Sequence, residues 1–157
     1  MLQINVDLGV DSTVGLVGSA FSAFLTTLVV GAILVAVVPE YTEERMAAVV
    51  DDPVGSLVYG LAVFLVVIVV MVVFAITIVG LLVALPLALL LYVVWALGST
   101  IAYLAIADRL VGHDDGWTLP LLVAAGINGA LVLSVVGGLV GFLVGAAGFG
   151  AVMAEYL

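Results

Sequence analysis

The sequence predicts an all-α integral membrane protein: a bundle of about five transmembrane helices with one short interfacial amphipathic helix. Hydrophobic residues make up 67% of the 157-residue chain and charged residues only 8%, which is too little polar surface for a soluble domain. Residues 54–107 contain no Asp, Glu, Lys, Arg or His. Because about 20 residues span the ~30 Å hydrocarbon core of a bilayer, this stretch must fold back as a helical hairpin, and we place its turn at residues 77–80.

The charged residues are unevenly divided, with eleven acidic residues, two arginines and a formal net charge of −9. Acidic loops without lysine favour a halophilic protein, because carboxylates hold water and ions while salt screens their mutual repulsion. Recruitment of a basic partner is the alternative interpretation. The negative charge argues against nucleic acid as a partner.

No metal, cofactor or catalytic group is expected. The chain has no cysteine, which excludes disulfides and thiolate ligands. The only histidine, His113, stands beside Asp114 and Asp115, and we interpret these residues as an acidic turn rather than a metal site. The apolar segments contain no Ser–His pair and no paired carboxylates, so intramembrane enzyme chemistry is not expected.

The first predicted span covers residues 14–38 and is rich in small residues, with Thr26 and Thr27 at its middle. Small residues let helices approach closely in lipid, so a packing face is favoured over a polar pathway. Pro39 ends this span and opens the next helix, at residues 39–50. That helix is too short and too acidic to cross the bilayer, and its apolar side fits a helix lying at the membrane interface.

The hairpin supplies the second and third predicted spans, at residues 54–76 and 81–107. Asp52 followed by Pro53 is typical of an N-cap and a first helical residue. Pro86 is expected either to kink the third span or to mark its first turn. Trp95 lies too deep in that span for an interfacial anchor and is expected to pack between helices.

The C-terminal stretch predicts a fourth span at residues 119–135 and a fifth at 139–154, separated at Gly137–Gly138. Two short crossings are favoured over a re-entrant pair of half-helices, which is tolerated only when buried in protein. Asn128 is the only amide in a predicted span, and an interhelical hydrogen bond is favoured over an ion or substrate contact. Glycines spaced four apart let another helix approach, and the predicted helix-packing or oligomer face comprises Gly137, Gly141, Gly145, Gly148 and Gly150.

The two arginines predict the orientation. Arg45 precedes the hairpin and Arg109 follows it, so both lie on the same side of the membrane. By the positive-inside rule that side is cytoplasmic. We therefore expect a multi-pass protein of the cell membrane with its N-terminus outside and its C-terminus in the cytoplasm.

The order of these segments resembles a known family. A span ending in Pro39 is followed by an arginine-bearing helix, the segment DDPVGSLVYG (51–60), an apolar hairpin and the run VVGGLVGFLVGAAGFGAVM (135–153). This order is similar to the multi-span membrane domain of bactofilin-type polymer-forming cytoskeletal proteins and their stand-alone relatives, from about residue 13 onward. In that family the hairpin turn usually has the form Gly-x-Pro, whereas Gly80 has no proline two positions later. The resemblance implies a membrane-embedded domain without catalytic residues.

Two functions follow as expectations. The first is a structural, anchoring or assembly module, as a homo-oligomer or with an envelope or cytoskeletal partner. The second is a small oligomeric transporter or channel, for which the hydroxyls and the one amide of the spans would be the polar lining.

Overall fold

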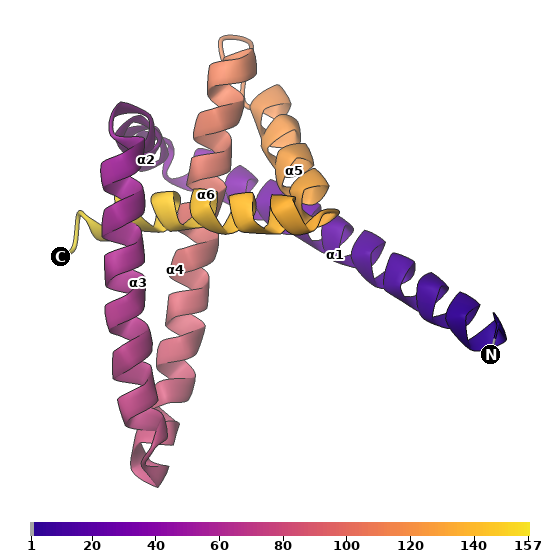
Figure 1. Ribbon diagram of the computed structural model, residues 1–157. Coiled ribbons are helices and arrows are strands. Elements are labelled where there is room, and N and C mark those ends of the chain that lie inside the picture. The colour runs from indigo at the N-terminus through magenta and orange to yellow at the C-terminus, as the bar shows by residue number, and fades with distance from the viewer. Residues whose placement is uncertain (1) are drawn as a thin grey trace.

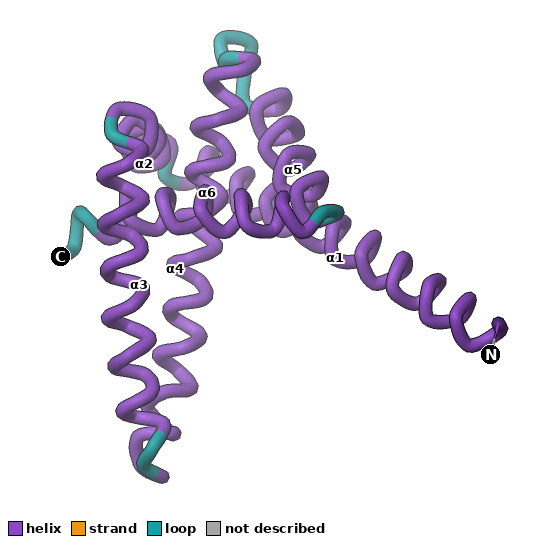
Figure 2. The backbone as a smooth tube through the Cα atoms, in the orientation of Figure 1, coloured by secondary structure: helices purple, strands orange, loops and turns teal. Residues whose placement is uncertain are grey.

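The computed structural model of the protein describes the backbone of residues 2–157 and the side chains of residues 11–157. All regular elements in these residues are helices (Figure 2), so the predicted all-α class is confirmed. The six helices are α1 (Leu2–Val37), α2 (Pro39–Asp51), α3 (Pro53–Ala75), α4 (Ile78–Val111), α5 (Thr118–Val132) and α6 (Val135–Met153).

Four of the described helical segments are long and apolar enough to cross a membrane: Asp11–Val37, Pro53–Ala75, Ile78–Val111 and Val135–Met153. The chain is therefore a multi-pass membrane protein. Helix α5 is apolar but has only 15 residues, which is shorter than the roughly 20 residues that a full crossing needs.

Two single residues, each followed by proline, connect the first three helices. Val38 has φ −135° and Asp52 has φ −138°, because a following proline disfavours the helical conformation. The side chain of Asp52 accepts a hydrogen bond from the amide of Gly55 at 2.8 Å, as expected for the predicted N-cap of α3. Helix α1 begins at Leu2 rather than near residue 14, and no proline interrupts the helix over residues 2–13.

The turn of the hairpin lies at Ile76–Thr77, slightly before the predicted position. Thr77 is the N-cap of α4, and its hydroxyl accepts a hydrogen bond from the amide of Gly80 at 2.9 Å. Gly80 therefore belongs to the first turn of α4, and the helix starts at Ile78 instead of residue 81. Pro86 lies inside α4 and not at its start.

The break between the last two helices also differs from the prediction. It falls at Leu133–Ser134, where the Ser134 hydroxyl accepts a hydrogen bond from the amide of Gly137 at 2.9 Å. The predicted break, Gly137–Gly138, is therefore the first turn of α6, and α5 ends at Val132 rather than at residue 135. A serine N-cap decides this boundary more strongly than the glycine pair.

The helices α3 and α4 form a long hairpin, and α6 runs across both of its legs instead of alongside them (Figure 1). Helix α2 lies at the end of the hairpin opposite to the turn, and α5 packs against α1. Toward its turn the hairpin exposes apolar side chains, as is typical of a surface that faces lipid. The exposed residues there include Leu65, Val66, Val69, Val72, Val73, Leu82, Leu85 and Leu89.

Candidate functional site

Among the described glycines, the closest approaches to the backbone of another helix are where α6 passes between α3 and α4. A Cβ atom added to Gly148 would lie 1.8 Å from the carbonyl oxygen of Gly98 in α4. A Cβ atom added to Gly150 would lie 1.9 Å from the carbonyl oxygen of Ser56 in α3. Residues two positions apart along a helix differ by about 200° in direction, so Gly148 and Gly150 bring opposite sides of α6 against the two legs.

The legs contribute glycines of their own to this crossing. A Cβ atom on Gly60 of α3 would lie 1.9 Å from the carbonyl oxygen of Ala146. One on Gly98 of α4 would lie 2.6 Å from the backbone of Phe149. Neither glycine belongs to the predicted packing face, because both are isolated and lack the GxxxG spacing. The available signal is that a lone glycine inside a helical run usually has a packing reason.

An aromatic cluster fills the space between the legs next to the crossing. The ring of Trp95 lies 5.0 Å from Phe64, 5.4 Å from Phe142 and 5.6 Å from Phe149, measured between centroids. Trp95 therefore packs between helices, as expected. A Cβ atom on Gly145 would lie 2.9 Å from its indole, so Gly145 makes room for the ring.

The two remaining glycines of the predicted face lie elsewhere. Gly137 is in the N-terminal turn of α6, where an added Cβ atom would lie 2.0 Å from the carbonyl oxygen of Leu131. At Gly141, an added Cβ atom would lie 3.0 Å from the Tyr103 hydroxyl. The predicted face is therefore divided: Gly145, Gly148 and Gly150 contact α3 and α4 of the same chain, whereas Gly137 and Gly141 border a cavity.

That cavity lies between α4, α5 and α6 and has a volume of about 310 Å³. Its polar lining comes from Ser99, Tyr103 and Asn128. The structure brings Asn128 and Thr27 together, with Asn128 Nδ2 donating a 2.7 Å hydrogen bond to Thr27 Oγ1 across α5 and α1. Thr26 does not join them, because its side chain is exposed on α1.

Arg45 joins α2 to the C-terminal end of α6. Its Nη1 donates a 3.3 Å hydrogen bond to the carbonyl oxygen of Ala151 and lies 3.7 Å from Oε2 of Glu155. A cation is favourable at a helix C-terminus, where carbonyl groups lack helical partners. Arg45 therefore caps α6, a role that its position in the sequence does not reveal.

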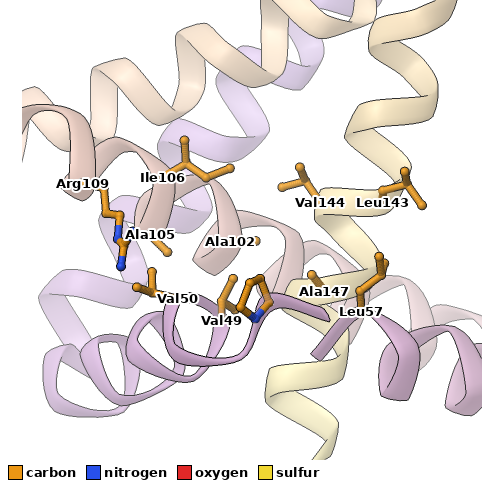
Figure 3. Close-up of a pocket in the computed structure, with 11 residues that line it drawn as sticks. Val49, Val50, Leu57, Ala102, Ala105, Ile106, Arg109, Leu143, Val144 and Ala147 are labelled. Atoms are coloured by element: carbon orange, nitrogen blue, oxygen red, sulfur yellow. The ribbon is translucent and has the colours of Figure 1, made fainter. Parts of the chain in front are cut away.

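Arg109 differs from Arg45 because it forms no ion pair with the described carboxylates. Its side chain stands at the edge of a groove of about 340 Å³ that α2, α3, α4 and α6 enclose (Figure 3). Apart from this guanidinium the groove is lined by apolar side chains and alanines. They include Val49, Val50, Leu57, Ile106, Leu143 and Val144.

The loop after α4 holds the histidine in a defined position. The His113 ring stacks on Trp117 with 4.3 Å between centroids, and its Nδ1 is hydrogen-bonded to the Asp108 carboxylate. That hydrogen bond raises the pKa of His113 above its ordinary value; partial burial lowers it, and the charges of Asp108, Glu43 and Asp114 raise it further. Among the residues whose side chains are described, no group of three His, Cys, Asp or Glu residues is placed to hold a metal ion.

Comparisons with curated proteins and with solved structures found no match. Comparison with protein families found one whose description is "Domain of unknown function (DUF8173)", and it matches residues 7–157. The match covers nearly the whole of this membrane bundle, including the helix crossing, the cavity and the groove. The chain belongs to the DUF8173 family.

Proposed function

We propose that this protein is a non-enzymatic structural module of the cell membrane, which anchors or assembles an envelope or cytoskeletal partner. The observation that supports it is the passage of α6 between α3 and α4, where backbone meets backbone at Gly148 and Gly150. Such packing leaves no space for the legs to slide over α6. A transporter instead needs one part of the bundle to rock against another.

The resemblance to the membrane domain of bactofilin-type proteins agrees with this proposal, since a filament-forming partner needs a fixed attachment point. Partner binding would use the end of the bundle at α2, because Glu40, Glu43 and Glu44 are exposed there. These acids would meet a basic surface on the partner, an attraction that weakens at high salt.

Assembly into a homo-oligomer would use α1 rather than α6. The glycines of the α6 crossing are occupied by α3 and α4, whereas a Cβ atom on Gly15 or Gly18 would meet nothing within 4 Å. Gly15 and Ser19, and likewise Gly18 and Ser22, are four positions apart. Small residues at this spacing favour close helix–helix association in lipid.

The test measures the mass of the protein oligomer in mild detergent by light scattering, for the variant Gly18→Leu and for the variant Gly138→Leu. Both glycines have open space around them, so neither variant should disturb the fold. We expect Gly18→Leu to reduce the oligomer and Gly138→Leu to leave it unchanged. A monomeric wild type that retains no protein from native membranes would contradict both the assembly and the anchoring roles.

The second candidate is a small oligomeric transporter or channel, which the polar cavity at Asn128 favours. Ion transport usually needs such polar groups inside the bilayer. Purified protein in liposomes would then carry an ion or solute flux that Asn128→Ala abolishes. Under the structural proposal, liposomes that contain the wild-type protein show no more ion or solute flux than liposomes without protein.

A further inference from the structure

We infer that the groove beside Arg109 binds one anionic phospholipid of the surrounding bilayer, with the phosphate on the guanidinium and an acyl chain along the apolar lining. The groove has a volume of about 340 Å³, within the range of about 300–1,000 Å³ usual for ligand sites. This inference does not depend on the anchoring role, because a bound lipid is compatible with any function of the bundle.

The shape and chemistry of the groove are those of a site for an amphiphile. In Figure 3 the guanidinium of Arg109 lies at one end, close to Val50, and the side chains of Leu143 and Val144 lie at the other. All the lining residues except Arg109 are apolar. A ligand that matches this arrangement has one charged end and a hydrocarbon body.

Arg109 is available to such a ligand. It is exposed, and no described carboxylate lies within ion-pair distance of it. Arg45, by contrast, is engaged by Ala151, Glu155 and Glu44. Of the two arginines, only Arg109 is therefore free to receive a phosphate, which a guanidinium can bind through two parallel hydrogen bonds.

The neighbouring acids narrow the choice of headgroup. Glu43, Asp51 and Asp108 line the depression on the other side of Arg109, together with His113. Their negative charges disfavour a polyanionic headgroup and are compatible with a single phosphate diester.

Native mass spectrometry of the detergent-purified protein tests the inference, with dioleoyl phosphatidylglycerol and dioleoyl phosphatidylcholine added as separate probes. We expect one phosphatidylglycerol per chain, retained about five- to tenfold better than phosphatidylcholine, because the choline group of phosphatidylcholine cancels the charge of its phosphate and phosphatidylglycerol keeps a net negative charge beside the guanidinium. Arg109→Gln should abolish this preference. Leu157→Glu makes the same change in net charge at an exposed site outside the groove and should leave it intact.

A second variant distinguishes lipid binding in the groove from a general effect of charge on lipid retention. Leu143→Trp fills the apolar end of the groove while Arg109 is unchanged, and its side chain is partly exposed, at 38%, so the fold should accept the indole. The Leu143→Trp variant should retain less of both phosphatidylglycerol and phosphatidylcholine than the wild-type protein does. Equal retention of the two lipids by the wild type, or unchanged preference in Arg109→Gln, would overturn the inference. So would a lipid-free dimer that Leu143→Trp dissociates, because the occupant would then be a second copy.

Discussion

Gly148 is the residue of α6 that lets this helix approach the backbone of α4. Its Cα lies so close to α4 that an added Cβ atom would stand 1.8 Å from the Gly98 carbonyl oxygen. A flexible side chain could move out of the way, but the obstacle here is backbone. Any larger residue must therefore push α6 away from α4, and it would disturb the contact of α6 with α3 as well.

We expect Gly148→Leu to lower the free energy of unfolding in mild detergent by about 3 kcal/mol or more, at the upper end of the cost of overpacking. Gly138→Leu on the same helix is the control, because nothing lies within 4 Å of the Cβ it adds. The control should be neutral or slightly stabilising, since leucine is a better helix former than glycine. Equal destabilisation of the two variants would contradict the close crossing.

A side-chain hydrogen bond joins Asn128 of α5 to Thr27 of α1, at 2.7 Å between Nδ2 and Oγ1, and Asn128 Nδ2 also donates a 3.4 Å hydrogen bond to the carbonyl oxygen of Ala23. Such bonds contribute little net stability, because an unfolded chain in a membrane also finds partners for its polar groups. The coupling between the two residues should be about 0.6 kcal/mol and at most about 1.7 kcal/mol.

A double-mutant cycle with Asn128→Leu and Thr27→Val measures this coupling. The matched cycle replaces Thr26 instead of Thr27; Thr26 is the adjacent threonine and is exposed on α1, so its coupling to Asn128 should be close to zero. Similar coupling in the two cycles would show that the hydrogen bond does not form.

The end of α4 and the loop that follows it form the pH-sensitive part of the chain. The hydrogen bond with Asp108 raises the pKa of His113 above that of the unfolded chain. The protonated histidine therefore stabilises the fold fully below about pH 6.5, its ordinary pKa. This contribution disappears as the pH rises through the higher folded-state pKa.

We expect Asp108→Asn to return the pKa of His113 toward its ordinary value and to flatten the pH dependence of stability above pH 6.5. The proton resonances of His113 report this pKa directly, because the chain has no other histidine. Asp115→Asn is the control, since the raised pKa is attributed to Asp108, Glu43 and Asp114 but not to Asp115. An unchanged titration in Asp108→Asn would contradict the contact.

The orientation of the bundle is a proposal that depends on where both arginines lie. Arg45 contacts the C-terminal end of α6, and Arg109 and Val50 of α2 line the same groove. Helix α2, which carries Arg45, and the C-terminal end of α4, which carries Arg109, both lie away from the hairpin turn (Figure 1). From the positive-inside rule we propose that this end of the hairpin is cytoplasmic, which would place the C-terminus inside and the N-terminus outside.

Single cysteines test this orientation cleanly because the chain has none of its own. A membrane-impermeant maleimide applied to intact cells should label Ile78→Cys, at the exposed hairpin turn, and not Glu44→Cys on α2. Permeabilised cells should label both positions. Labelling of Glu44→Cys alone in intact cells would reverse the proposed orientation.

The sequence alone was sufficient for the membrane class, the hairpin and the order of the helices. Apolar length sets which segments enter the bilayer, and Pro39, Pro53 and the Asp52 cap mark the first two connections through local backbone chemistry. The predicted helix boundaries near Thr77 and Ser134 differ by a few residues from those in the structure. Serine and threonine N-caps and glycines are competing signals for the end of a helix, and the caps set these two boundaries.

Only the tertiary structure decided which surfaces meet. Lipid tails are as apolar as the side chains of these spans, so hydrophobicity does not distinguish a face that packs against protein from one that faces lipid. The passage of α6 between α3 and α4 depends on backbone contacts at Gly60 and Gly98, and the capping of α6 by Arg45 joins residues 106 positions apart. Contacts of this kind depend on shape and distance in three dimensions, which the residue pattern along the chain does not record.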